Sequence, residues 1–374
     1  MPAKLRILHT ESSVGWGGQE IRILTEARGM LDRGHAVALV TPAEAPLYSA
    51  AEKLGIPVAA LPIGRKNWKG LLALRHWLAA RDWEFDIINT HSSTDSWLTA
   101  LACAMRPKAP AIVRTRHVST AVNAGFGTRW LYLHATTHIV TTGEALRFQL
   151  HSDRGFPLDR MTSVRTGIDL ARYRPLDRAH CRALLGLADA PTVGIVATLR
   201  DWKGHDVLFE AWPSLLREVP EARLAIVGDG PCHDRLDEQV SRLGIGASVR
   251  FVGHKENVTE WLSAFDVFAL PSWGEEGVPQ AIMQAMACGV PVVSTPVGAI
   301  GELVRDGDTG LLVPPQDAAA LAAALARLHD EPELRASLAR RAREHVRERF
   351  ARERMLERME AVFRSVASEA RAPK

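Results

Sequence analysis

The stretch PSWGEEGVPQAIMQAMACGVPVVS, residues 271–294, decides the fold expected for this chain. It follows a strand-like run, Asp266 to Leu270, and combines a turn rich in Gly and Pro with a helix that we expect to begin near Pro279. Pro at the first helical position loses no hydrogen bond, and the free amide groups beside it attract phosphate. A carboxylate there cannot favour phosphate, so Glu276 is expected to hold hydroxyl groups. Phosphate and a polyol together indicate a nucleotide sugar.

The same stretch has a simpler interpretation. Two acidic residues, Glu275 and Glu276, are favourable at a helix N-terminus because they complement the helix dipole, with no ligand involved. Taken alone, the stretch favours this second interpretation, so the choice depends on the rest of the chain.

Apolar, β-branched runs alternate with amphipathic helical periodicity along the whole sequence. This alternation predicts parallel sheets with helices on both faces. The expected strands are Leu5–His9, Ala36–Thr41, Val58–Leu61, Ile87–Thr90, Ala111–Thr115, Ile139–Thr142 and Met161–Val164, then Val193–Ala197, Arg223–Val227, Val249–Val252, Val267–Leu270, Val290–Ser294 and Gly310–Val313.

The pattern restarts after a segment near Thr166 to Pro175, which predicts two domains. A length of 374 residues suits two domains that each bury a core. The fold class is therefore α/β, with two Rossmann-like doubly wound domains. The expected bounds are 1–170, 171–348 and, for a final Arg- and Glu-rich helix, 349–374.

Composition excludes several classes of protein. Hydrophobic residues make up 47% of the chain and charged residues 24%, which is typical of a globular protein. Residues 1–170 carry 20 Lys and Arg against 14 Asp and Glu, so the first domain is the basic one. The net charge of the whole chain is only +3 and no basic cluster is large, so nucleic acid is not expected as a partner.

The chain is expected to be cytoplasmic. Its first residues lead directly into a strand, unlike a signal peptide, and no apolar run is long enough to span a bilayer. The four cysteines lie far apart and lack zinc or redox spacing, so we expect reduced, structural thiols. They are Cys103, Cys181, Cys232 and Cys288.

The densest basic stretch, residues 65–78, also has a broad apolar stripe at helical spacing. A helix that packs on the core explains it most simply. A helix at an anionic lipid surface, with aromatic and cationic side chains among the headgroups, is the alternative.

Residues 271–294 resemble the donor-binding signature of the retaining glycosyltransferases of the glycogen-synthase-like family four. That pattern has Pro-Ser, a Glu-Gly pair, a second Glu further on, and then Ala-Met-Ala-Cys-Gly-x-Pro-Val-Val. Glu276 matches the first Glu, whereas the second position holds Gln284, an amide without charge. The resemblance implies the GT-B fold, in which two domains face each other across a cleft and the terminal helix returns to the first domain.

The resemblance also implies roles for residues of the second domain. Arg200 and Lys203 would meet the leaving phosphates, and Glu276 would hold sugar hydroxyls. The other donor contacts would come from turn and helix-start residues, largely through backbone groups, and from the amide at the second acidic position. These are Gly228, Gly230, Gly253, His254, Gly277, Val278, Pro279 and Gln284.

In the first domain the resemblance places a Gly-Gly loop, Gly17 and Gly18, against donor and acceptor. Trp16 is unusual there and is available to stack on a sugar. His117 follows a strand and would position the transferred sugar without acting as a base. Arg114 and Arg116, beside it, would bind an anionic acceptor or be simply solvated. The glycines do not form a dinucleotide fingerprint, because Glu20 occupies the third glycine position.

No metal cofactor is expected. Asp306-Gly307-Asp308 has an acid-x-acid spacing that holds metal in the other large glycosyltransferase fold, but the residues that follow indicate a polar turn. With Arg200 and Lys203 available for the diphosphate, none is required.

The sequence as a whole predicts a metal-independent retaining glycosyltransferase. It would move a sugar from a nucleoside diphosphate to an acceptor hydroxyl. The basic first domain favours a saccharide or lipid-linked acceptor in lipopolysaccharide or other envelope polysaccharide assembly, with peripheral contact at the inner face of a membrane. A nucleotide-sugar 2-epimerase and a non-catalytic sugar-nucleotide-binding protein remain as alternatives, the latter encouraged by Gln284.

Overall fold

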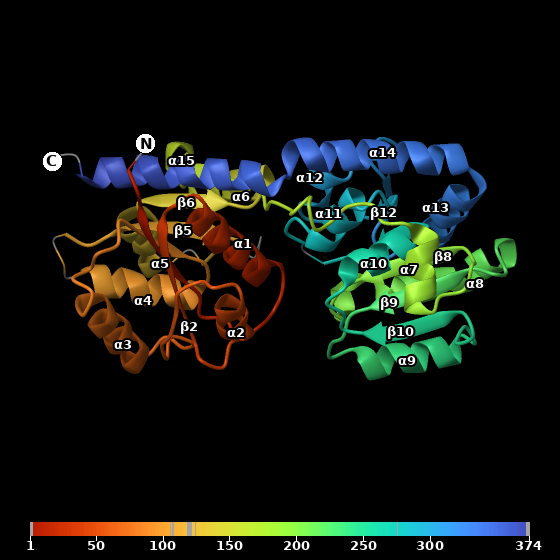
Figure 1. Ribbon diagram of the computed structural model, residues 1–374, viewed down its shortest axis with the longest axis horizontal. Helices are drawn as coiled ribbons and strands as arrows, with labels where there is room; N and C mark the ends of the chain where they lie inside the picture. Colours follow the sequence, from red (N-terminus) through yellow and green to blue (C-terminus); the bar gives the residue numbers. More distant parts are fainter. Residues whose placement is uncertain are drawn as a thin grey trace. The chain divides into compact units, whose positions relative to one another are not determined.

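The computed structural model describes residues 3–371 apart from residues 105, 107, 118–121, 124 and 275, so Glu275 of the decisive stretch lies outside the described residues. The chain divides into two compact units (Figure 1). The first contains residues 1–167 and 352–374, and the second residues 168–351. Each unit is an α/β domain with a fully parallel sheet, which confirms the predicted fold class.

The first unit has a seven-stranded sheet in the order β3-β2-β1-β4-β5-β6-β7. Strands β1 to β3 are added to the sheet in one direction, and β4 to β7 are added in the other, starting beside β1. The carboxyl ends of β1 and β4 therefore lie at the switch point, where doubly wound sheets bind ligands. The strands are β1 (Arg6–Thr10), β2 (Ala36–Thr41), β3 (Val58–Ala60), β4 (Ile87–Thr90), β5 (Ala111–Arg116), β6 (His138–Thr141) and β7 (Met161–Ser163).

Helices cover both faces of this sheet because successive strand residues point to opposite sides. Ile7 and Ile87 belong to one apolar cluster with α1, α2 and α15, whereas Leu8 and Ile88 belong to a second cluster with α3, α4 and α6. The helices are α1 (Gly18–Asp32), α2 (Pro46–Lys53), α3 (Trp68–Ala79), α4 (Ser93–Ala104), α5 (Phe126–Trp130), α6 (Glu144–Arg154) and α15 (Arg352–Arg371), with short turns at Leu131–Ala135 and Leu158–Arg160.

The terminal helix α15 packs on the first unit although it follows the second in sequence. Its apolar residues recur every three or four positions, and Met355, Met359 and Phe363 are buried in the same cluster as α1. The chain crosses between units at residues 167–168 and 351–352. The backbone N–H of Ile168 donates to the carbonyl of Phe350 at 2.7 Å, so the two ends of the second unit are joined to each other.

The second unit repeats the design with six strands, ordered β10-β9-β8-β11-β12-β13. Its central strand β11 is buried along its whole length, as expected where helices cover both faces. The strands are β8 (Thr192–Val196), β9 (Arg223–Val227), β10 (Val249–Gly253), β11 (Val267–Leu270), β12 (Val292–Ser294) and β13 (Leu311–Leu312).

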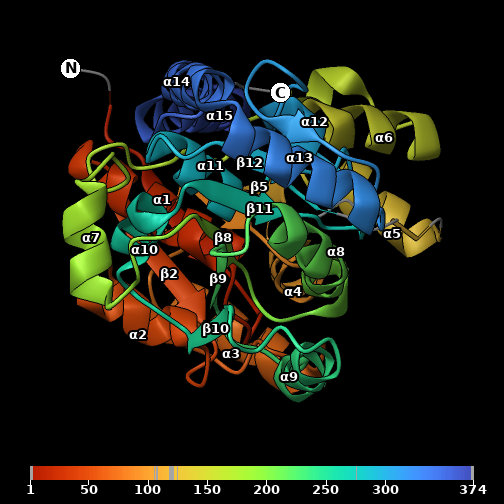
Figure 2. The same ribbon diagram turned by 90° about the vertical axis from the view of Figure 1, so that its right-hand side faces the viewer.

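The helices of the second unit share one large apolar cluster with this sheet. Figure 2 shows α8 and α13 side by side, and the two pack together. The helices are α7 (Arg178–Leu185), α8 (His205–Glu218), α9 (His233–Arg242), α10 (Val258–Ala264), α11 (Gln280–Ala287), α12 (Ile300–Leu303), α13 (Ala318–Asp330) and α14 (Pro332–Arg349), with a short 3₁₀ turn at Asp201–Lys203. One expectation is corrected: Pro279 is the N-cap residue of α11 and Gln280 is its first helical residue.

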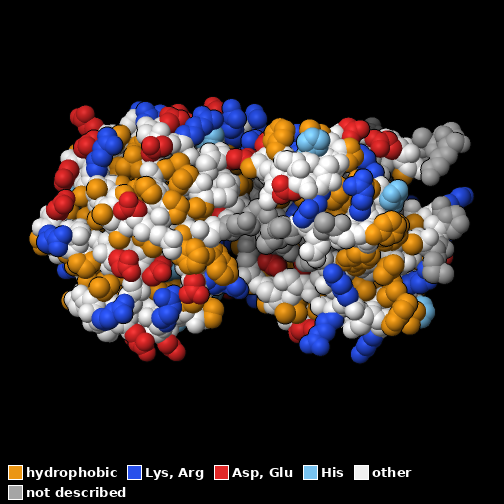
Figure 3. Space-filling model, turned by 180° about the vertical axis from the view of Figure 1, so that it is seen from behind, with side chains coloured by type: hydrophobic (Ala, Val, Ile, Leu, Met, Phe, Trp, Pro, Cys, Tyr) orange, Lys and Arg blue, Asp and Glu red, His pale blue; other side chains and the backbone are white. Residues whose placement is uncertain are grey.

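The basic stretch predicted as a helix is α3, which packs against α4. Leu74 and Leu78 are buried, so a core-facing stripe exists. Trp68 and Leu72, which the sequence places in the same stripe, are instead 77% and 49% exposed. On the face drawn in Figure 3, hydrophobic side chains alternate with small groups of charged ones. All four cysteines are free, and no helix within the described part of the chain is long and apolar enough to cross a membrane.

Candidate functional site

In the second unit, Lys203 and Glu276 meet at the carboxyl ends of β8 and β11. The Nζ atom of Lys203 lies 2.6 Å from Oε1 of Glu276, and the hydroxyl of Ser272 donates to the same oxygen at 2.9 Å. Glu276 is buried and the Lys203 side chain is largely so. The pair therefore sets a fixed cation beside a fixed carboxylate at the sheet edge where parallel sheets bind ligands.

Two glycines allow the loops that carry this pair to approach each other. Gly204, at φ +76°, would place a Cβ atom 2.0 Å from the carbonyl oxygen of Pro271. Gly298, at φ +55°, would place one 2.0 Å from the carbonyl oxygen of Glu276. Any larger residue would therefore separate the loops and is also strained at these backbone angles.

Arg200 does not join the Lys203–Glu276 pair. Its guanidinium lies over the ring of Trp202, 5.2 Å from the ring centre, and its side chain is exposed. The neighbouring Asp201 is paired with Arg235 at 2.7 Å. Both cations lie at this turn, but only Lys203 contacts the carboxylate.

Gln284, the departure from the family pattern, lies on α11 and is buried. Its Nε2 donates to the hydroxyl of Tyr173 at 3.1 Å. Burial raises the pKa of Tyr173, so this hydroxyl stays protonated at neutral pH. The amide therefore already has one structural partner in the second unit.

The remaining predicted donor residues of this unit line the same edge of the sheet. The turn Gly228–Pro231 packs on the loop after β8, where the N–H of Leu199 donates to the carbonyl of Asp229 at 3.1 Å. Gly253 accepts from the N–H of Gly228 at 3.0 Å, and His254 beside it is exposed. Gly277 and Val278 lead from Glu276 into the start of α11.

In the first unit, three histidines at the carboxyl ends of adjacent strands form a hydrogen-bonded row. Nδ1 of His9 lies 3.0 Å from Nε2 of His91, and Nδ1 of His91 lies 3.0 Å from Nε2 of His117. Burial lowers the pKa of His9 to about 3 and lowers the pKa values of His91 and His117 well below their usual range. All three rings are therefore neutral at physiological pH.

Two buried carboxylates lie beside this row. Asp95 accepts hydrogen bonds from the hydroxyl of Thr10 and the backbone N–H groups of His91 and Ser92 at 2.8 to 3.0 Å. Glu11 accepts from Ser92. Burial, with Asp95 nearby, raises the pKa of Glu11 to about 8, and burial raises that of Asp95 to about 6. Glu11 is thus a carboxyl group held largely in its protonated form at pH 7.

Arg114 and Arg116 both contact the Tyr132 side chain, Arg114 at its ring and Arg116 at its hydroxyl. The Arg114 guanidinium lies 4.5 Å from the ring centre, and Nη1 of Arg116 donates to the hydroxyl at 3.1 Å. Arg114 is buried, and its Nη1 has no hydrogen-bond partner among the described residues. Burial lowers the pKa of Lys66, and the nearby positive charge of Arg114 lowers it further. Arg114 and Lys66 are therefore two neighbouring cations, and Nη1 of Arg114 has no hydrogen-bond partner among the described residues.

The loop after β1 takes the predicted form. Gly17 is the N-cap residue of α1 and Gly18 its first helical residue, while Trp16 is 43% exposed. Glu20 in the first turn is buried, and burial raises its pKa. Trp16 and the two glycines lie at the start of α1, whereas His117 follows β5 two strands away, so the sheet order separates them.

Sequence reasoning missed several of these residues. His9 and His91 occupy strand ends and lack any motif, and Ser272 and Tyr173 act through single hydrogen bonds that only the folded chain reveals. The one available signal was position: Glu11, His91 and Lys66 all follow expected strands of a parallel sheet.

The Asp306–Asp308 segment is a turn tied to α14. Asp306 accepts from the N–H of Leu312 at 2.9 Å, and Asp308 is paired with Arg341 at 3.1 Å. Among the described residues, no group of three or more His, Cys, Asp or Glu side chains is arranged to hold a metal ion.

Comparison with known proteins adds family relationships. Residues 190–331 match the model described as glycosyl transferases group 1, and residues 16–172 match the model described as glycosyltransferase family 4. The D-inositol 3-phosphate glycosyltransferase of Nocardia farcinica is 33% identical over 368 residues, which covers 85% of this chain and 78% of the relative. The phosphatidyl-myo-inositol mannosyltransferase of Mycolicibacterium smegmatis is 29% identical, over 88% of this chain and 86% of that protein.

A third relative matches over a shorter region. The D-inositol 3-phosphate glycosyltransferase of Saccharomonospora viridis is 37% identical over 219 residues, 55% of this chain and 50% of the relative, so the match spans half the length of that protein. Among solved structures, a glycosyltransferase from Rickettsia africae matches with a TM-score of 0.88 at 19% identity, covering 97% of this chain and 98% of the other. Anabaena HepE in complex with UDP and glucose matches with a TM-score of 0.84 at 24% identity, over 96% and 100%. These likenesses are to GT-B structures.

Proposed function

Because this chain belongs to glycosyltransferase family 4, we propose that it is a retaining glycosyltransferase that moves a sugar from a nucleoside diphosphate to an acceptor hydroxyl. The observation that carries the proposal is the Lys203–Glu276 pair, with Nζ and Oε1 2.6 Å apart at the carboxyl edge of the second sheet. A sugar diphosphate needs a cation for its phosphates and an acceptor of hydroxyl protons for its sugar. This pair offers both in adjacent positions.

In this proposal the second unit binds the donor. Lys203, Arg200 and the start of α11 meet the negative charge that develops on the departing diphosphate. Glu276 orients sugar hydroxyls, and the turns at Gly228–Pro231 and Gly253 receive the nucleoside through backbone groups. Because Lys203 is already held by Glu276, little reorganisation is needed when the leaving group becomes charged.

His117 would act as a hydrogen-bond donor to the transferred sugar. Each neutral imidazole carries one N–H, so the two hydrogen bonds of the His9–His91–His117 row must run in one direction. Nε2 of His9 is buried, and no described residue lies within hydrogen-bond reach of it. Buried N–H groups without partners are rarer than unpaired acceptors, so this nitrogen is the bare one. The row then ends with an N–H on Nδ1 of His117.

The proposed chemistry keeps the configuration of the sugar. The diphosphate leaves, the acceptor attacks from the same face through an oxocarbenium-like state, and the departing phosphate takes the acceptor proton. Glu11, protonated and hydrogen-bonded to Ser92, would contribute polarity to the first unit without adding a negative charge.

For the acceptor we propose a phosphate-bearing polyol, either free or lipid-linked, within envelope glycoconjugate assembly. Support comes from Arg114, a buried guanidinium with an unpaired Nη1, and from the nearby Lys66. The relatives from Nocardia and Mycolicibacterium are named for inositol phosphate and phosphatidylinositol acceptors. This favours a phosphorylated polyol over the lipopolysaccharide acceptor that the basic composition first suggested.

Peripheral contact with an anionic membrane would bring such a lipid acceptor within reach. Trp68 and Leu72 are exposed on α3 beside Lys69, the combination that favours the headgroup region of a bilayer.

Calorimetric titration with UDP, GDP, ADP, CMP and NAD in the absence of metal tests the proposal. We expect tight binding of one nucleoside diphosphate. The matching sugar nucleotide should bind more tightly than the diphosphate in the wild type but not in Glu276→Ala, because the mutant lacks the group that holds the sugar. Binding of NAD alone, or of none of the five, would overturn the proposal.

A further inference from the structure

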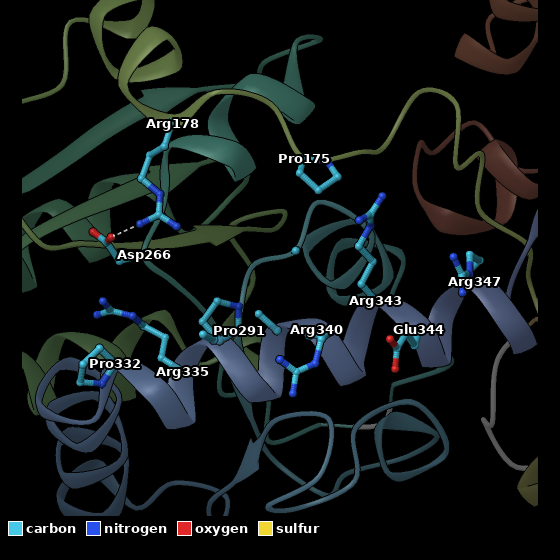
Figure 4. Close-up of a pocket in the computed structure, with 13 residues that line it drawn as sticks. Pro175, Arg178, Asp266, Pro291, Pro332, Arg335, Arg340, Arg343, Glu344 and Arg347 are labelled. Carbon is cyan, nitrogen blue, oxygen red and sulfur yellow. Dashed lines mark hydrogen bonds and ion pairs between the residues drawn. The ribbon is translucent and has the colours of Figure 1, made fainter.

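The second unit contains a groove that lies away from the proposed donor site. It has a volume of about 520 Å³ and is bordered by α14, by the start of α7 and by the residues that precede β11 and β12 (Figure 4). A volume of this size accommodates a small phosphorylated molecule or a lipid headgroup. Asp266 and Pro291 mark the amino ends of β11 and β12, whereas Lys203 and Glu276 lie at the carboxyl ends of β8 and β11. The groove and the donor site therefore occupy opposite edges of the same sheet.

Arginines dominate the lining of the groove. Five arginines line it, against two carboxylates, Asp266 and Glu344. Asp266 is already paired with Arg178 at 2.6 Å and with Arg182 at 2.5 Å, so it does not neutralise the arginines of α14. The groove therefore has a net positive charge. Its arginines are Arg178, Arg335, Arg340, Arg343 and Arg347.

Arg343 and Arg347 are the most informative members of this group. They are exposed and four positions apart on α14, so their charges repel each other along one face of the helix. Within the part of the chain that the structure describes, neither guanidinium makes an ion pair or a hydrogen bond. In Figure 4 Arg343 rises from α14 toward the loop that carries Pro175.

A merely solvated helix face is the simpler explanation, and α15 supplies a direct comparison. Arg354 and Arg358 are also exposed, four positions apart and on a helix. They do not line the groove. What distinguishes Arg343 and Arg347 is a concave surface with three further arginines around it. Arginines that line a concave surface suit phosphate, because a phosphate group accepts two parallel hydrogen bonds from one guanidinium, one on each of two oxygens.

We propose that this groove binds a phosphate-bearing ligand, independently of the donor site. The ligand is either a small phosphorylated molecule or the headgroup of an anionic lipid, since both present the same phosphate oxygens. Arg343 and Arg347 contact the phosphate, Arg335 adds charge, and the Pro175 and Pro291 side chains provide apolar walls.

Titration with inorganic pyrophosphate at constant ionic strength tests the proposal, with all proteins carrying Lys203→Gln so that the proposed donor site contributes little. We expect Arg343→Gln/Arg347→Gln to bind pyrophosphate about tenfold or more weakly, because each lost contact is a charge-assisted hydrogen bond. The matched pair Arg354→Gln/Arg358→Gln removes the same charge with the same spacing and should bind like its parent. Far-UV circular dichroism verifies that both pairs fold.

Equal affinities in the two double variants would overturn the proposal, because pyrophosphate would then respond only to net charge. Sedimentation with vesicles of phosphatidylcholine, with and without phosphatidylglycerol, distinguishes the two sources of phosphate. If Arg343→Gln/Arg347→Gln no longer sediments with anionic vesicles, while Arg354→Gln/Arg358→Gln still does, the ligand is a lipid headgroup. Unchanged sedimentation, together with weaker pyrophosphate binding, identifies a soluble ligand. Neither result depends on the proposed glycosyl transfer, which the nucleotide titration tests separately.

Discussion

Lys203 and Glu276 are joined by a 2.6 Å contact between Nζ and Oε1, although 73 positions separate them in sequence. Ser272 donates to the same carboxylate oxygen, and Gly298 lies against the backbone of Glu276. The loop after β11 is thereby tied to the turn after β8. A change in either member of the pair consequently alters the environment of the other.

Removing either charge should lower activity strongly. We expect Lys203→Gln and Glu276→Gln each to reduce kcat/KM about 100-fold, as for loss of one group that stabilises developing charge. Because the residues are in contact, the double variant should lose much less than the product of the two effects. Initial rates with the sugar nucleotide found by calorimetry measure this. Ser272→Ala, which removes only a supporting hydrogen bond, is the control. If the loss of kcat/KM in the double variant equals the product of the two single losses, the coupling between Lys203 and Glu276 is contradicted.

The tautomer assigned to His117 in the histidine row can be tested by NMR spectroscopy. ¹⁵N chemical shifts should show the proton of His117 on Nδ1, with Nε2 bare, at neutral pH. His91→Phe removes the donor to Nε2 of His117, so the tautomer should become mixed and kcat should fall more than KM changes. His91→Gln keeps an N–H donor and should restore most of both readouts. A proton found on Nε2 of His117 in the wild type would contradict the assignment.

The close approach of Gly298 to the backbone of Glu276 predicts that a larger residue at position 298 lowers stability. Gly298→Ala places a methyl group 2.0 Å from the carbonyl oxygen of Glu276 at a positive φ, so it should destabilise the second unit by about 3 kcal/mol and lower activity. Gly301→Ala is the matched control, because its added methyl group meets no atom within 4 Å. Urea unfolding followed by tryptophan fluorescence measures both. Equal stability of the two variants would show that the loop shifts without cost.

Glu26 should make the stability of the first unit depend on pH. Burial raises the pKa of Glu26 to about 7, only partly offset by Arg22, with which it forms a 3.8 Å contact. A raised folded-state pKa favours the protonated folded form, so this contribution to stability is full below about pH 4.5 and is lost as pH rises to about 7. The loss is about 3 kcal/mol at most.

Comparing the wild type with Glu26→Gln at several pH values tests this. The amide keeps the acceptor for Asn89, whose Nδ2 donates to Glu26 at 3.0 Å, but it cannot ionise. The variant should therefore gain stability relative to the wild type as pH rises from 5 to about 7.5. Parallel pH profiles for the two proteins would mean that Glu26 is already ionised at low pH.

Exposed apolar residues on α3 should govern contact with anionic vesicles. Trp68→Ser/Leu72→Ser should reduce sedimentation with vesicles containing phosphatidylglycerol, because it removes the apolar side chains that would enter the bilayer. Phe126→Ser is the control, since Phe126 is 88% exposed but lies on α5. Equal loss in the two variants would indicate general hydrophobic adhesion, and no loss in either would remove α3 from the membrane proposal.

Much of the fold was predictable because strand and helix periodicity are local properties. Every expected strand is present within one or two residues. The sequence predicted a junction near Thr166 to Pro175, and the chain crosses between units at residues 167–168. The start of α11 was predicted one residue early, because Pro279 fits both the N-cap and the first helical position. The stripe of α3 was only partly right, since Trp68 lies six positions before Leu74 and therefore on a different side of the helix, and packing against α4 buries only Leu74.

The sequence by itself determined the class of fold, the two-domain organisation and the loops that carry the candidate site. These follow from hydrophobic periodicity, turn residues and a local motif. Only the tertiary structure decided which side chains meet: Lys203 with Glu276, His9 with His91 and His117, and the arginines of α14 with the amino ends of β11 and β12. Such contacts join positions far apart in the chain. They depend on the order of strands in a sheet and on side-chain burial, neither of which is encoded in the spacing of residues along a single segment.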